Sequence, residues 1–64
     1  MNPDGATLSS IASSLEELTR RITDIAERYQ DTDLEDVALS LYEAERALGT
    51  ARRRIDKATS GLPT

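Results

Sequence analysis

The chain has 64 residues and a formal net charge of -4, with 31% charged residues, 3% aromatic residues, and neither cysteine nor histidine. This composition excludes a disulfide framework and the common zinc sites. A chain this short is only marginally stable unless a disulfide, a metal or oligomerisation stabilises it, and of these three oligomerisation remains. Few aromatic residues argue against a stacking platform for single-stranded nucleic acid. Because the chain has no long apolar run and no signal-peptide pattern, we expect a cytoplasmic protein without membrane association.

The first predicted helix covers about residues 6–29. Its apolar residues recur at steps that alternate between three and four, which is the pattern of a coiled-coil seam. Asn2 and Pro3 are able to start this helix earlier, with proline in its first position, and Thr7 is a later candidate for the N-cap. The seam residues are Leu8, Ile11, Leu15, Leu18, Ile22, Ile25 and Tyr29.

A turn at about residues 30–32 separates this helix from a second one, predicted over about residues 33–59. Thr32 followed by Glu35 predicts a capping box, in which the threonine oxygen accepts from an early helical N–H and the glutamate reaches back. The second seam shows the same alternation and is formed by Leu34, Val37, Leu41, Ala44, Leu48, Ala51, Ile55, Ala58 and Leu62.

Two glycines bear on the second helix. Gly49 interrupts it at an outer position, which costs about 1 kcal/mol relative to alanine. The apolar series continues beyond this glycine, so we expect a continuous helix, with a hinge after Leu48 as the alternative. Gly61, followed by Pro63, predicts the helix end, with the glycine in the left-handed conformation.

These elements predict an all-α fold: a single domain over residues 1–64, built as an antiparallel two-helix coiled-coil hairpin. The link between the helices is too short for any return other than an antiparallel one. Small residues beside the predicted seam allow a second helix pair to pack closely. We therefore expect the hairpin to dimerise into a four-helix bundle.

A partner interface is predicted outside the seam. Alanines flank the seam, and Leu39 and Tyr42 lie three residues apart near a basic side chain, where tyrosine and arginine are favoured as interface anchors. The partner is the chain itself, another helical protein, or both. In the alternative interpretation, Tyr42 covers the edge of the hairpin and Leu39 is merely tolerated. The predicted interface consists of Ala12, Ala26, Ala38, Leu39, Tyr42 and Arg46.

Basic residues gather near the end of the second helix, at Arg52, Arg53, Arg54 and Lys57. Three interpretations compete: the cations complement the helix dipole, they bind an acidic protein segment, or they contact an anion such as nucleic acid. Nucleic acid is the weakest of these, because an overall acidic domain lacks the basic footprint of such proteins.

The sequence shows no combination of residues that would form a catalytic site. Without cysteine or histidine, serines near the start of the first helix have no candidate base, and the three glycines form no phosphate loop. We expect a protein that is not an enzyme and needs no cofactor or metal. The sequence therefore predicts a non-catalytic protein–protein interaction module, a small regulatory or accessory subunit that acts as a homodimer or bound to helices of a larger protein. The alternative is a nucleic-acid accessory factor or an anionic-nucleotide-sensing bundle that uses Arg52–Arg54. The residues indicate no particular family.

Overall fold

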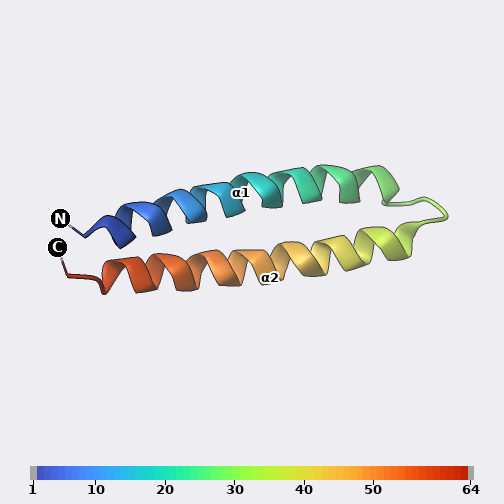
Figure 1. Cartoon of the computed structure of the whole chain (residues 1–64). Helices are drawn as coiled ribbons and strands as arrows, with labels where there is room; N and C mark the ends of the chain where they lie inside the picture. The colour runs from blue at the N-terminus through green and yellow to red at the C-terminus, as the bar shows by residue number, and fades with distance from the viewer. Residues whose placement is uncertain (1, 64) are drawn as a thin grey trace.

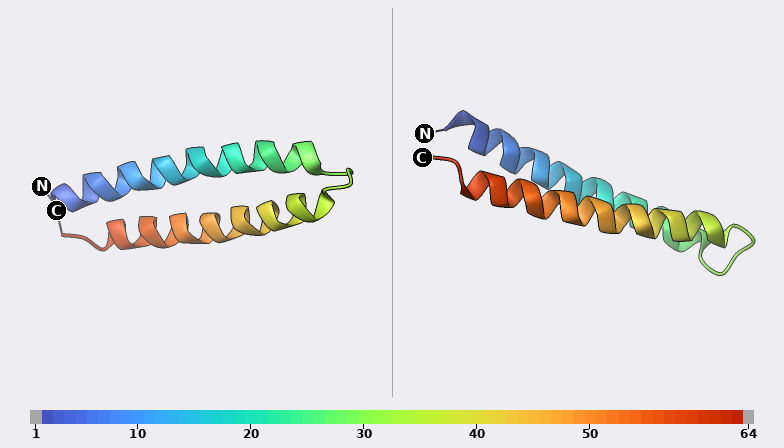
Figure 2. Two further views of the ribbon diagram at one scale, coloured as in Figure 1. Left: turned by 45° about the vertical axis from the view of Figure 1, so that its right-hand side comes forward. Right: turned by 90° about the horizontal axis from the view of Figure 1, so that it is seen from below.

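The structure, a computed structural model, is a hairpin of two helices and describes residues 2–63 (Figure 1). Helix α1 spans Pro3–Tyr29 and helix α2 spans Glu35–Ser60. The helices run antiparallel, with both termini at one end of a molecule 51 Å long. Figure 2 shows them side by side from two further directions. The predicted helical hairpin is confirmed, and the predicted bounds at residues 1 and 64 lie outside the described residues.

The start of α1 lies at Pro3, before the predicted position of about residue 6. Asn2 is the N-cap: its backbone is extended and its Oδ1 accepts a hydrogen bond from the N–H of Asp4 at 2.9 Å. Proline at the first position loses no helical hydrogen bond. The negative Asp4 carboxylate interacts favourably with the positive end of the helix dipole. The hydroxyl of Thr7 donates to the carbonyl of Pro3 at 3.1 Å, so Thr7 is not the cap.

The turn is longer than predicted, because α2 begins at Glu35. The Thr32 hydroxyl donates to the carbonyl of Tyr29 at 2.6 Å and accepts from the N–H of Leu34 at 3.1 Å. The predicted capping box is therefore wrong: the hydroxyl stabilises the turn, and the N-cap of α2 is Leu34, without a side-chain hydrogen bond. Asp31 has a φ of 60° and reverses the chain in the left-handed region, which aspartate tolerates better than most residues.

Helix α2 passes through Gly49 without a break, which excludes the hinge after Leu48. A Cβ at this position would meet only the Arg53 side chain, 3.5 Å away, so no neighbour requires a glycine here. Gly61 follows the last helical residue with φ -85° and ψ -7°, and the predicted left-handed conformation is therefore wrong. Its N–H donates to the carbonyls of Ala58 and Lys57 at 3.1 and 3.2 Å, which tightens the final turn in a right-handed form.

The helices meet along a line that is rotated from the predicted seam. Some residues, spaced seven apart, belong to both the predicted seam and the observed line of contact. They are Leu8, Leu15 and Ile22 of α1 and Leu41, Leu48 and Ile55 of α2. Of the predicted residues between these positions, Ile11, Leu18 and Ile25 are exposed, whereas Ala44 and Ala51 are half-buried. Small or polar residues face the other helix at these levels. In α1 they are Ala12, Thr19 and Ala26, and in α2 they are Ala38, Glu45, Arg52 and Thr59.

Alanine explains the rotation. Ala26 is 0% exposed and Ala38 is 1% exposed, and small side chains at both positions let the two backbones approach closely near the turn. The larger seam residues Ile11, Leu18 and Ile25 would hold the helices further apart. Among residues 2–63, no large side chain is fully buried, so the hairpin has a line of contact rather than a core. Neither helix, over that same range, contains a stretch apolar and long enough to cross a membrane.

Candidate interaction surface

One contact between the helices defines the two broad faces of the hairpin. The hydroxyl of Thr23 on α1 donates to the carboxylate of Glu45 on α2. The flank of α1 that carries Thr19 and Thr23 therefore meets the flank of α2 that carries Glu45. We call this side the polar face. The opposite flanks of both helices must then meet on the other side, because each helix presents only two flanks beside its line of contact.

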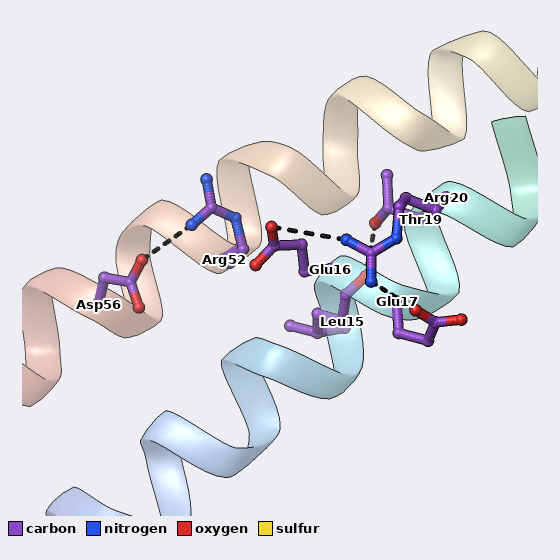
Figure 3. A network of polar contacts seen from close by, with 7 residues as sticks. All are labelled: Leu15, Glu16, Glu17, Thr19, Arg20, Arg52 and Asp56. Atoms are coloured by element: carbon purple, nitrogen blue, oxygen red, sulfur yellow. Dashed lines mark hydrogen bonds and ion pairs between the residues drawn. The ribbon is translucent and has the colours of Figure 1, made fainter.

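Along the polar side and its outer edge, two arginines pair with carboxylates of their own helices (Figure 3). Arg20 pairs with Glu16 at 3.6 Å and also with Glu17, and Arg52 pairs with Asp56 at 3.1 Å. The hydrogen bond from Arg20 to the Glu17 carboxylate, followed by the attraction of its charge, raises the pKa of the Arg20 guanidinium. Such exposed pairs contribute little to stability. They make this side well solvated.

The other side is the apolar face, which we define by Ile11, Leu18 and Ile25 of α1 and by Val37, Ala44 and Ala51 of α2. The three α1 residues are 43%, 46% and 38% exposed, although isoleucine and leucine usually lie inside a folded protein. All six recur every seven residues, so they form two parallel stripes along the hairpin. Val37 is 41% exposed, whereas Ala44 and Ala51 are half-buried, so the hairpin covers the α2 stripe in part and leaves the α1 stripe largely in water.

A shallow groove lies within this face. Its volume is about 350 Å³, and it is lined by Leu18, Arg21, Ile22, Ile25 and Leu48. The groove joins α1 to α2, since Leu48 belongs to the second helix. Its lining is apolar except for Arg21, whose aliphatic stem can cover the neighbouring leucine while the charge stays in water. A groove of this kind accepts apolar side chains from another helix rather than a polar small molecule.

The predicted interface alanines have a different place. The structure buries Ala12, Ala26 and Ala38 between α1 and α2. They cannot present a surface to a partner while the hairpin is intact, and this part of the prediction is corrected. The larger residues beside them, which the apolar spacing predicts in the seam, form the apolar face instead.

The remaining predicted interface residues lie away from the apolar face. The hydroxyl of Tyr42 donates to Oε1 of Gln30 at 3.1 Å, which ties this half-buried ring to the turn. That contact favours the interpretation in which Tyr42 covers the hairpin edge. Leu39 is 56% exposed, and Arg46 is exposed on the same helix. A single exposed leucine is ordinary for a protein surface and does not by itself form a site.

The four basic residues near the end of α2 do not all lie on one surface of the helix. Arg52 lies at the line of contact between the helices and pairs with Asp56, whereas Arg53 donates to the hydroxyl of Thr50 at 3.2 Å. Successive positions on a helix differ by about 100°, so Arg54 points in a third direction. Lys57 lies on the outer surface, one turn beyond Arg53 and Arg54. Arg53 and Arg54 therefore neighbour Lys57 on the outer surface of α2, whereas Arg52 lies apart from them at the line of contact.

Other classes of site receive no support from the described part of the chain. Residues 2–63 contain no group of three acidic, histidine or cysteine side chains able to hold a metal ion. Comparison of the chain with protein-family models, with curated proteins and with solved structures finds no match. The apolar face is therefore the feature from which a function can be argued.

Proposed function

We propose that this protein is a non-catalytic interaction module, a small regulatory or accessory subunit that presents its apolar face to other helices. Those helices belong to a second copy of the chain or to a larger helical protein. The observation that carries this proposal is the exposure of Ile11, Leu18 and Ile25, one large apolar residue in every second turn of α1. Water contact with such a stripe is unfavourable, and burying it against helices is the common solution.

The shape of the face supports helices as the partner. Its two stripes repeat every seven residues along both α1 and α2, which matches the spacing at which another helix pair presents its own side chains. An extended segment would instead need unpaired backbone groups at a sheet edge, and residues 2–63 contain no strand. The proposal is therefore a four-helix assembly, in which the hairpin supplies two helices.

The arrangement of Arg52, Arg53 and Arg54 favours no second function. Two of these guanidiniums are already hydrogen-bonded within α2, and the three side chains point in different directions. An anion site of high affinity requires several donors directed at one point. Non-catalytic protein binding also accounts for a chain without cysteine or histidine.

Sedimentation equilibrium at low and at high salt tests the proposal. We expect the wild-type chain to form an assembly larger than one chain at micromolar and higher concentrations, and salt should not dissociate it, because apolar burial is not weakened by screening. An assembly held by charged groups would instead weaken as salt rises. A fully helical single chain at every concentration and at both salt levels would contradict the proposal.

A further inference from the structure

We propose that the occupant of the apolar face is a second copy of this chain, in a two-fold dimer whose two turns lie at the same end. In this dimer, α1 of each copy packs on α2 of the other. The inference rests on the proposed function and adds to it the identity of the partner and its orientation. Three independent observations carry it: the area left exposed, the distribution of large and small residues, and the distribution of charge.

The exposed area matches what one such interface needs. The hairpin exposes 4856 Å² of surface. A compact monomer of 7.0 kDa would expose only about 4,000 Å². The excess of about 850 Å² is close to the ~800 Å² that each partner contributes to a stable interface of standard size. The surface that the hairpin exposes is therefore large enough to form one interface with a second copy.

Large and small residues divide between the two stripes. The α1 stripe carries Ile11, Leu18 and Ile25, whereas the middle of the α2 stripe carries Ala44 and Ala51. A copy that packs its α1 on the other copy's α2 places large residues against small ones at both contacts. Both contacts then have the same width, which permits the close packing that protein interiors show.

The heights of these residues, meaning their positions along the long axis of the hairpin, agree with a dimer whose two turns lie at the same end. The hydrogen bond from Thr23 to Glu45 marks two positions of about equal height on α1 and α2. From Thr23, Ile25 lies two residues toward the turn and Leu18 five residues away from it, whereas from Glu45, Ala44 lies one residue toward the turn and Ala51 six residues away from it. Each large residue therefore lies within about 3 Å of the height of one alanine, at the helical rise of 1.5 Å per residue. Each large residue of one copy therefore meets its smaller counterpart in the other copy.

The opposite arrangement, with the turns at opposite ends, fits the same residues poorly. It packs α1 on α1 and α2 on α2, so that Leu18 meets Leu18 and Ala44 meets Ala44 across the two-fold axis. One side of the interface would be wide and the other narrow. Two hairpins with flat faces cannot satisfy both widths without tilting or leaving voids, and voids forfeit packing energy.

Charges at the border of the face also favour turns at the same end. By helical spacing, Arg21 and Arg28 border the α1 stripe, while Asp36 and Glu43 border the α2 stripe. Both pairs are seven residues apart. Measured from Thr23 and Glu45, Arg28 lies between the heights of Asp36 and Glu43, and Arg21 lies four residues, or about 6 Å, beyond Glu43. The dimer therefore places two arginines of one copy beside two carboxylates of the other, a complementarity that specifies orientation.

Distance measurement between single spin labels tests the arrangement, because the chain has no native cysteine. A label on Asp33→Cys reports the separation of the two turns. A label on Arg46→Cys, on the outer surface near the middle of α2, reports association in either arrangement. With neighbouring helices packed ~8–10 Å apart, we expect the Asp33→Cys labels to lie within roughly 30 Å of each other. Turns at opposite ends would separate them by about the 51 Å length of the hairpin.

The outcomes separate this inference from the proposed function. Short distances at both positions support the dimer described here. A short distance at Arg46→Cys with a long one at Asp33→Cys overturns the orientation but keeps the proposed function. If neither label detects a second copy, the inference is overturned. The proposed function then fails as well only if sedimentation also finds a stable, fully helical single chain.

Discussion

A Leu18→Gln substitution is expected to weaken self-association by roughly 1,000-fold, while the hairpin remains helical. Leu18 is 46% exposed, so about half of its surface is left for a partner to cover. Losing that burial costs about 1 kcal/mol per copy. Burying an amide without a hydrogen-bond partner costs at least about 1 kcal/mol more. A two-fold dimer carries the change twice, which gives about 4 kcal/mol, or three decades in the dissociation constant.

Leu39→Gln is the matched control for this prediction. It makes the same chemical change on the same fold, at a leucine that is 56% exposed and lies off the apolar face. Sedimentation equilibrium should find its dissociation constant within a few-fold of the wild type. Ala44→Glu, which adds a charge at a half-buried position of the apolar face, should dissociate the assembly as Leu18→Gln does, with circular dichroism as the check that the hairpin stays helical. If Leu39→Gln were the disruptive variant, the interface would lie on the outer surface of α2 instead.

An Ala26→Leu substitution is expected to destabilise the hairpin by about 1–3 kcal/mol, the cost of forcing extra atoms into a packed contact. Ala26 is 0% exposed and lies where α1 and α2 approach each other near the turn, as does Ala38. A leucine has no space there unless the helices move apart. That movement would strain the contact from Tyr42 to Gln30, which links α2 to the turn. Chemical denaturation followed by circular dichroism measures the change.

Ala6→Leu provides the comparison for Ala26→Leu. Ala6 is exposed on α1, and alanine and leucine have similar helix propensities, so its stability should change by no more than about 0.5 kcal/mol. A gain in stability at position 26 would show that large residues belong between the helices. In that case the seam that the apolar spacing predicts, with Ile11, Leu18 and Ile25 facing α2, would be the correct one.

The sequence predicted the helices well because their signals are local. The alternating three and four spacing from Leu8 to Tyr29 specifies a long amphipathic helix, and a short polar turn specifies an antiparallel return. The cap at Asn2 was also available in the sequence, since proline at the first helical position is a known start signal. The turn was less predictable, because the Thr32 hydroxyl could either cap the second helix or form hydrogen bonds within the turn. In the structure it forms hydrogen bonds within the turn.

The rotation of the seam could not be read from periodicity alone. Leu8, Leu15 and Ile22 belong both to the predicted line of contact and to the observed one. The two lines differ only in the residues between them, and the choice depends on how closely two backbones approach. One signal was present: Ala12, Thr19 and Ala26 are small and recur every seven residues, as a close helix contact requires. This spacing favours the small residues between the helices and the larger ones on an exposed side.

Cysteine protection on the apolar face tests the central claim most directly, because it measures whether that face is covered. Ala44→Cys changes the side chain little, and the chain contains no other thiol. We expect its reaction with a thiol reagent to be slow in concentrated protein and to accelerate on dilution, as assemblies dissociate by mass action. The outward-facing Leu39→Cys should react at the same rate throughout. Equal rates for Ala44→Cys at every concentration, with the helices intact, would contradict the account.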